Sequence, residues 1–597
     1  MISIIFLTLK IFLTALFCGL GFTSIFLPNS LRKNGFLWLS FWFGLILIAL
    51  LGVILSFGKV SMEQAKYIIL LISLFFLIYG YLEKKISFNF SKDFWVIFLL
   101  TIVIFSFNIF PLIAKAGFPT TVSLGNLDPI SYNTVADFFK TQTVFQGKEL
   151  IFYKPYLWSI GDLVHYSFRW GSPMILSFFA SIFNVRSYQV FSILLTLIFT
   201  MTYPLVCILA EILNKGKNKL LPIIIFLVFG FNSTILYMLY NVFFAQFLFT
   251  GFFILMLIIF SSYLLDKQSS NLKFNSYDFL IGAIIASLSN VYPEGISFVF
   301  ISWIIFLLIK MFTKDRFTYL VIFTKIILIA SFINPFNMGT AINWNLNLFI
   351  NTTKITWIGW EKIRYALPLE IMGFYNLYFS RNLPKIISLI LGLPIIFLWI
   401  IGVLNIKNRL LILSHLATFI IICFVYRFIY PNYFTFHKSI TYSLFIFSIL
   451  FAIGLSTILF QLKNKFIIPF ILIVVTVLTL RSAFRTVSQL YYHPRIVDKS
   501  LVSLEKLNKN ADIKEPFYTS DVFLGEYDLW KRLWREYLLS DKQIITKQNI
   551  TQVGLPTDNI KNILGEKNFL NYDNKELVYK KIIWENEYYQ LGEAKLK

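Results

Sequence analysis

Apolar runs of about 20 residues recur along the chain, separated by short polar connections. A run of that length spans the hydrocarbon core of a bilayer as an α-helix. The pattern therefore predicts an all-α polytopic membrane protein with about fourteen transmembrane helices. We place them at 2–27, 36–57, 66–82, 94–113, 187–213, 220–239, 244–265, 277–292, 295–312, 317–333, 384–404, 409–426, 438–460 and 466–484.

The connections between these spans alternate in charge. One set is basic and includes Arg32, Lys215, Arg316 and Lys407, whereas the other set holds few or no basic residues. Cytoplasmic connections of membrane proteins carry an excess of Lys and Arg. The alternation therefore predicts that both termini lie outside the cytoplasm. It also predicts that three large segments, at 114–186, 334–383 and 486–597, lie outside.

Composition supports this class of protein. Residues are 57% hydrophobic and only 14% charged, which excludes a soluble globular protein. The net charge of +23 belongs almost entirely to the first 485 residues, so it reflects short basic loops rather than nucleic-acid binding. Cys18, Cys207 and Cys423 lie within apolar runs without metal-ligand spacing. We expect no disulfide and no zinc site.

Three regions follow from the pattern. Residues 1–93 hold three N-terminal transmembrane helices, and 94–485 form the transmembrane core with its two large loops. The pattern in residues 486–597 predicts a small soluble α/β domain. Its short strands are expected at FYTSDVF and KQIIT, around a helix at GEYDLWKRLWREYLL. The run LVYKKIIWENEYYQL predicts a β-hairpin.

The most informative stretch is LGNLDPISYNTVADFF, from Leu124 to Phe139. It carries two carboxylates, Asp128 and Asp137, between long apolar runs. A helix starting near Pro129 puts Asp128 and Tyr132 close to one face, since they are four residues apart. We expect Asp128 at the outer membrane surface, as a catalytic base or as a polar anchor for a charged head group.

Another surface helix is predicted from Tyr156 to Trp170. Asp162, His165 and Arg169 share a face there, because they are spaced by three and four. They form either a solvated face with ion pairs or a cationic shelf for a phosphate, to which Arg offers a bidentate fork. The following run, 171–184, is too short to span and predicts a re-entrant or interfacial helix.

Further polar groups gather where later spans meet the outer side. Tyr292 and Glu294 lie in SLSNVYPEG, and Arg427, His437 and Lys438 bracket the turn RFIYPNYFTFHK. A carboxylate beside an apolar wall is costly unless it is paired or functional. Glu294 is therefore either a solvated turn residue after Pro293 or part of a site.

These residues resemble the GT-C superfamily of integral membrane glycosyltransferases, which use sugars carried on polyprenyl phosphate or pyrophosphate. The pattern Asp128-x-x-x-Tyr132-x-x-x-Ala136, followed by RWGSPMILSFFASIFN, is similar to the first outer loop of that family. The loop 334–383 follows the seventh span counted from 94–113, where the family has its second large loop. The resemblance covers about 94–485 plus the tail.

The resemblance implies roles for the outer polar groups. Asp128 would take the proton from the acceptor hydroxyl, and Arg169 or the cluster Arg427, His437 and Lys438 would hold the lipid phosphate. Many members carry paired acidic residues where this chain has Asp128 and Pro129, so a divalent metal, Mg²⁺ or Mn²⁺, stays open. The candidate substrate-binding residues are Tyr132, Asp162, His165, Arg169, Tyr292, Glu294, Arg427, His437 and Lys438.

The expected function is transfer of a sugar from a polyprenyl-phosphate donor to a glycan, lipid or protein acceptor. The reaction would take place outside a bacterial-type cytoplasmic (inner) membrane, in cell-envelope glycan synthesis or modification. Expected partners are the lipid-linked sugar and membrane lipids, and no nucleic acid. Two alternatives remain: a transporter or flippase for lipid-linked glycans, and an O-antigen-type polymerase or ligase.

Overall fold

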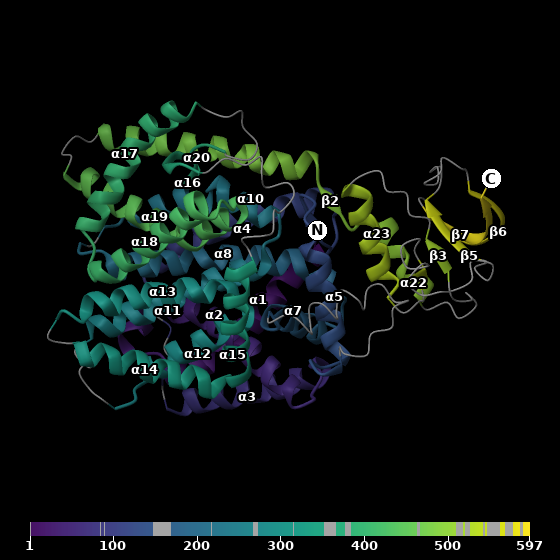
Figure 1. Cartoon of the computed structure of the whole chain (residues 1–597), viewed down its shortest axis with the longest axis horizontal. Helices are drawn as coiled ribbons and strands as arrows, with labels where there is room; N and C mark the ends of the chain where they lie inside the picture. Colours follow the sequence, from purple (N-terminus) through teal and green to yellow (C-terminus); the bar gives the residue numbers. More distant parts are fainter. Residues whose placement is uncertain are drawn as a thin grey trace.

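Long helices pack side by side into one bundle, and a small mixed α/β unit formed by the C-terminal residues lies at one end of it (Figure 1). The computed structural model describes residues 2–83, 85–86, 88, 90–146, 169–216, 218–266, 273–313, 316–351, 366–376, 384–461, 466–508, 517–519, 526–540, 544–545, 562–566, 577–585 and 589–596.

Every predicted span coincides with helical structure, which confirms the all-α polytopic fold class. The helices concerned are α1 (Ile2–Phe26), α2 (Asn29–Phe57), α3 (Met62–Leu82), α4 (Lys92–Lys115), α8 (Ser187–Leu213), α9 (Leu221–Ile225) with η3 (Phe226–Gly230) and α10 (Ser233–Tyr240), α11 (Phe244–Leu265), α12 (Ser276–Val291), α13 (Pro293–Lys310), α14 (Arg316–Ile333), α17 (Lys385–Leu404), α18 (Arg409–Phe424) with η5 (Val425–Ile429), α19 (Tyr433–Gln461) and α20 (Ile467–Tyr492).

Fewer than fourteen of these helices are long enough to cross a membrane alone. Among the described residues, 11 helices have the length and apolar character of a span, or up to 13 if each of two bent pairs forms one span. The predicted span at 277–292 is the 16-residue helix α12, which falls short of the usual span length.

Local sequence explains where the helices break. The span predicted at 220–239 bends by 49° before α10, where the Asn232 side chain caps the new helix by accepting from Thr234 N at 2.9 Å. Helix α14 turns by 107° into α15 (Pro335–Asn351). Pro335 disfavours the helical conformation for the residue before it, so α14 ends there.

The connections gather at two ends of the bundle, as the alternation of basic and non-basic loops predicted. At one end, Lys407 N donates to Leu213 O at 2.6 Å and Asn408 Nδ2 donates to Ser261 O at 3.1 Å. At the other end, Asn126 Nδ2 donates to Asn241 O at 2.8 Å. Which end faces the cytoplasm stays a prediction.

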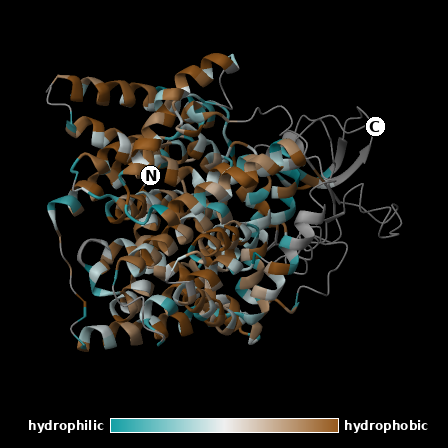
Figure 2. Cartoon of the chain, turned by 60° about the vertical axis from the view of Figure 1, so that its left-hand side comes forward, coloured by the Kyte–Doolittle hydropathy of each residue, from teal (hydrophilic) through white to brown (hydrophobic). Residues whose placement is uncertain are grey.

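The outside of the bundle is apolar. Leu71 and Phe75 of α3 are 65% and 66% exposed, and Phe470 of α20 is 65% exposed. Figure 2 shows hydrophobic residues along the helices, with hydrophilic residues mostly at the connections. Large apolar side chains that face outward along the length of a helix are expected on the lipid-facing surface of a membrane protein.

Within the described part of the first large segment, two short helices pack into the bundle. Helix α5 (Asp128–Thr141) confirms the helix predicted from Pro129, and α7 (Gly171–Ile182) confirms the short helix at 171–184. Every residue of α7 from Gly171 to Ser181 is buried, and α7 packs against α2, α5 and α8. The surface of α7 is therefore covered by neighbouring helices, and its re-entrant or interfacial position relative to a membrane stays a prediction.

The C-terminal residues build a five-stranded mixed sheet in the order β4-β3-β5-β7-β6. Both predicted strand segments are present, as β3 (Phe517–Thr519) and β4 (Ile544–Ile545), and α23 (Glu526–Leu538) is the predicted helix. The predicted hairpin is the antiparallel pair β6 (Leu577–Glu585) and β7 (Tyr589–Leu596), and β5 (Asn562–Glu566) is an additional strand.

The junction between bundle and tail is continuous. Helix α20 runs to Tyr492 and so crosses the boundary predicted at 485/486. Beyond α20, β2 (Arg495–Ile496) pairs with β1 (Val122–Ser123), which lies just before α5. Two short helices, α21 (Lys499–Ser503) and α22 (Glu505–Asn508), follow β2. The tail is thus joined to the segment that leads into α5.

Candidate functional site

Asp128 is the first residue of α5 and is held there by its neighbours. Its backbone N–H donates to the Asn126 side chain at 3.2 Å, and Leu124 N donates to Tyr240 O at 2.9 Å. Pro129 occupies the first turn, where its fixed backbone angle favours the helix start. A carboxylate at this position is also stabilised by the positive end of the helix dipole.

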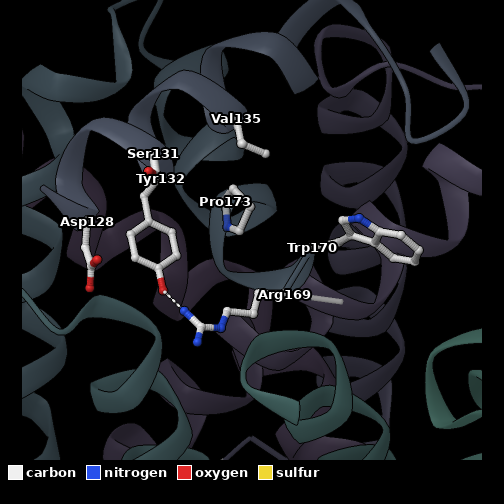
Figure 3. Close-up of a pocket in the computed structure, with 7 residues that line it drawn as sticks. All are labelled: Asp128, Ser131, Tyr132, Val135, Arg169, Trp170 and Pro173. Carbon is white, nitrogen blue, oxygen red and sulfur yellow. Dashed lines mark hydrogen bonds between the residues drawn. The ribbon is translucent and has the colours of Figure 1, made fainter. Parts of the chain in front are cut away.

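Asp128 lines a cavity of about 90 Å³ together with Tyr132, Arg169 and Trp170. Ser131, Val135 and Pro173 complete its wall. Figure 3 shows Asp128 and Tyr132 side by side on α5, with the Tyr132 hydroxyl pointing toward Arg169. The predicted common face of Asp128 and Tyr132 is therefore confirmed, and it faces a cavity.

Arg169 is fixed by two partners from different segments. Its Nε donates to Glu294 Oε2 at 3.2 Å and its Nη2 donates to Glu294 Oε1, which makes a bidentate ion pair. Its Nη1 donates to the Tyr132 hydroxyl at 3.3 Å. The Arg169 side chain is 25% exposed and that of Glu294 only 7%. Glu294 is thus the buried half of the pair, and Arg169 reaches the cavity.

Burial and charge act together on these groups. Burial opposes the charged form of Arg169, but Glu294 together with Tyr132 and Tyr292 outweighs it and holds the pKa of Arg169 well above its ordinary value. Burial raises the pKa of Tyr132 to about 12, against the opposing effect of Arg169. Arg169 therefore stays cationic, and Tyr132 stays a neutral hydroxyl, at any physiological pH.

Tyr292 connects this pair to two further helices. Its hydroxyl accepts from Gln246 Nε2 and from the Tyr442 hydroxyl, each at 3.1 Å. Its ring lies 5.0 Å from Arg169 Cζ and 5.7 Å from Lys438 Nζ. Both distances lie within the range of cation–π attraction. The ring therefore holds two cations on the same side of the bundle as Asp128.

The structure brings together six of the predicted site residues. Asp128, Tyr132 and Arg169 line the cavity, Glu294 holds Arg169, and Tyr292 stacks on it. Lys438 joins them at the Tyr292 ring, and its charge interacts with those of Arg169, Glu294 and Asp128. The interpretation of Glu294 as a solvated turn residue is wrong, because its carboxylate is buried in an ion pair.

The remaining predicted residues are placed differently. Arg427 is exposed on η5, with its guanidinium 5.1 Å from the Phe428 ring. His437 is buried at 4% exposure beside Phe436. Of the predicted cluster of Arg427, His437 and Lys438, Lys438 therefore contacts the site through the Tyr292 ring. Asp162 and His165 lie outside the described residues.

Gln246 and Tyr442 are contacts of the site that were not among the predicted site residues. Gln246 is a polar residue in the first turn of a long apolar helix, and this position is a usable signal. Tyr442 lies in an aromatic-rich run without any distinguishing spacing. Only the packing of α19 against the chain near Tyr292 identifies it.

The residues beside Asp128 do not by themselves make a metal site. In the described ranges, no group of three or more His, Cys, Asp or Glu side chains could hold a metal ion. Glu294, the other carboxylate near the cavity, is engaged by Arg169. We derive no step of the reaction through Mg²⁺ or Mn²⁺.

No protein-family model matches this sequence, and no curated protein matches it. Among solved structures, the chain is similar to the archaeal oligosaccharyltransferase AglB from Archaeoglobus fulgidus, solved in complex with an inhibitory peptide and a dolichol-phosphate. The two are 12% identical with a TM-score of 0.45, over 79% of this chain and 69% of that one. The function proposed below rests on the residues of the cavity.

Proposed function

We propose that this chain is a membrane glycosyltransferase that transfers a sugar from a polyprenyl-phosphate donor to an acceptor outside the cytoplasm. The observation that carries the proposal is an acid beside a fixed cation in one cavity. Among the described residues, the Asp128 carboxylate makes no hydrogen bond or ion pair, and Arg169 lines the same cavity with its orientation set by Glu294.

Asp128 supplies the base. As the acceptor oxygen attacks the sugar carbon, its proton passes to the Asp128 carboxylate, and the bond from that carbon to the phosphate oxygen breaks. A base must lie within hydrogen-bond reach of the proton it takes. A carboxylate that lines the cavity, and that has no hydrogen-bond or ion-pair partner among the described residues, is available to an entering hydroxyl.

Arg169 supplies the positive charge that stabilises the departing lipid phosphate. The electron pair of the breaking bond leaves with the lipid phosphate, whose developing charge needs fixed donors. The bidentate contact with Glu294 keeps the guanidinium from following the substrate, and the hydroxyl of Tyr132 holds a second edge of it. Lys438 adds a second cation behind the Tyr292 ring.

The position of the site favours an enzyme over a transporter. A transporter of lipid-linked glycans needs binding groups near the middle of its spans. Asp128 lies in the first turn of α5, Arg169 just before α7 and Glu294 in the first turn of α13. These are helix termini at one end of the bundle, where a lipid head group would meet an acceptor. A polymerase or ligase would use the same chemistry with a different acceptor.

The test compares Asp128→Asn with Asp93→Asn in membranes that hold equal amounts of each protein. Asp93 is an exposed carboxylate in the first turn of α4, at the opposite end of the bundle, and serves as the matched control. Each of a panel of polyprenyl-phosphate sugars carries a label on its sugar, and the amount of label transferred to glycan is measured.

We expect Asp128→Asn to lower transfer by about 10²–10⁴-fold, the usual contribution of a general base. Binding of a polyprenyl phosphate and the elution volume in detergent stay at the wild-type level. Asp93→Asn transfers like the wild type. Full transfer by Asp128→Asn would remove that residue from the mechanism.

A further inference from the structure

The second carboxylate of α5, Asp137, lies at the other end of the helix from Asp128 and is fully engaged. Its Oδ2 accepts from Arg186 Nε and from the Tyr537 hydroxyl, each at 2.6 Å. Its Oδ1 accepts from Ser187 N at 3.0 Å. Three donors on one carboxylate, two from the start of α8 and one from α23 of the tail, make a junction between three elements.

Tyr537 is the contribution of the C-terminal unit to this junction. Its ring lies 4.7 Å from the Arg186 guanidinium, and its backbone carbonyl accepts from Arg186 Nη2 at 3.3 Å. Its hydroxyl also lies 3.2 Å from Ser187 Oγ. Burial, followed by the charge of Asp137, raises the pKa of Tyr537 well above its ordinary value. The hydroxyl therefore stays protonated and remains a donor.

Apolar contacts close the same interface. Ile130 of α5 and Tyr188 of α8 belong to a buried cluster with Trp530 and Trp534 of α23 and with Leu501 of α21. Ile130 lies one helical turn or less from Asp128, so the tail covers the catalytic end of α5 as well as the Asp137 end. A contact of this kind excludes water from the polar junction and strengthens it.

The tail also holds the chain that leads into α5. Thr120 Oγ1 donates to Val497 O at 2.7 Å, and Val497 N donates to Thr121 O at 3.1 Å, beside the β1–β2 pair. Gly125, with φ +118°, lets the chain turn toward α5, and a Cβ there would meet Arg495 Nε at 2.9 Å. The C-terminal unit therefore contacts α5 near its end and also contacts the chain just before its start.

We propose that Asp137 and Tyr537 are positioning residues, through which the C-terminal unit sets the place of α5 and with it the Asp128 carboxylate in the cavity. The proposal rests on the proposed function of Asp128. Asp128 and Asp137 are about 13 Å apart along a helix that rises 1.5 Å per residue. A helix transmits a tilt at one end to the other, and a misplacement of 1 Å at a reacting group costs about 10²-fold in rate.

The test removes one oxygen atom, by Tyr537→Phe, which keeps the ring and the apolar cluster. Tyr277→Phe makes the same change in a buried tyrosine of α12, whose hydroxyl donates to Asp266 Oδ2 at 3.1 Å, and is the matched control. Amide hydrogen exchange is followed on α5 and, as an internal reference, on α11 in the purified full chain. Transfer is measured as kcat and as KM for the polyprenyl-phosphate sugar.

We expect Tyr537→Phe to raise exchange of the α5 amides by about tenfold, the equivalent of one hydrogen bond to a charged group, with α11 unchanged. We expect kcat to fall by about tenfold while KM stays within about twofold, because Arg169 and Lys438 are not moved. Asp137→Asn changes α5 exchange in the same direction. Combined with Tyr537→Phe, it adds less than the sum of the two single effects. Tyr277→Phe changes neither quantity.

Unchanged α5 exchange in Tyr537→Phe would overturn the proposal, whatever happens to transfer. Faster exchange with unchanged kcat would also overturn it, because the junction would then be structural only. These outcomes differ from failure of the proposed function, which is full transfer by Asp128→Asn with the α5 exchange of the wild type.

Discussion

The Arg169–Glu294 pair gives the most direct quantitative prediction about the site. Glu294→Gln keeps the size of the side chain and removes its charge. The Arg169 guanidinium then loses the carboxylate that receives Nε and Nη2, while Tyr132 alone still accepts from Nη1. Breaking one side of a buried ion pair costs about 3–5 kcal/mol.

The cost at this position is smaller, because Arg169 is 25% exposed and water compensates part of the lost charge. We expect Glu294→Gln to lose about 2–3 kcal/mol of the energy that holds Arg169 in its orientation, which corresponds to about 30- to 140-fold in an equilibrium constant at 1.4 kcal/mol per factor of ten. The lost orientation should appear as weaker phosphate binding. The assay is the Kd for a polyprenyl phosphate of defined length, measured with the purified full chain.

Glu63→Gln is the matched control for this change. Glu63 pairs with Lys66 three residues along α3, with side-chain exposures of 36% for Glu63 and 12% for Lys66. Because the Glu63 carboxylate is 36% exposed and Lys66 keeps Ser181 O as a second partner, we expect this pair to contribute about 0–1 kcal/mol. We expect its Kd within about threefold of the wild type. An unchanged Kd in Glu294→Gln would refute the idea that the ion pair prepares Arg169 for a phosphate.

Three further predictions follow from single groups. Tyr132→Phe removes one acceptor of Arg169 and should weaken polyprenyl-phosphate binding by about 3- to 10-fold, the value of one net hydrogen bond, in the same Kd assay. Because burial raises the folded-state pKa of Tyr132 to about 12, the unfolded chain ionises first as pH rises. The wild type should therefore lose stability relative to Tyr132→Phe from about pH 10 upward, and thermal melts at stepped pH measure the difference. In α12 and α14, Asp278 and Lys325 form a buried ion pair at 2.6 Å with 0% and 6% side-chain exposure, so Asp278→Asn should destabilise the chain by about 3–5 kcal/mol, whereas replacing both by apolar residues should be close to neutral in Tm.

The sequence predicted the helices well because their signal is local. A run of apolar residues of span length identifies a membrane helix without knowledge of its neighbours. Pro129 and Asp128 marked the start of α5 for the same reason, since a helix terminus depends on a few adjacent residues. Alternating loop charge then grouped the connections correctly into two sets.

The sequence could not predict contacts between distant segments. It gave no sign that Arg169 pairs with Glu294, which follows it by 125 residues and lies in the first turn of α13. It grouped Arg427 with Lys438 because they flank one turn, but the structure places Lys438 over the Tyr292 ring and Arg427 over the Phe428 ring. The burial of α7 and the junction of Asp137 with Tyr537 were missed because both depend on packing between elements far apart in the chain.

The central claim is that the cavity beside Asp128 is where a lipid phosphate and an acceptor meet. The most direct measurement is an experimental structure of the full chain in a lipid nanodisc with a bound polyprenyl phosphate. The account predicts the phosphate in hydrogen-bond contact with Arg169, with the Asp128 carboxylate facing the space beside it. A phosphate bound away from this cavity, or Asp128 turned out of it, would contradict the account.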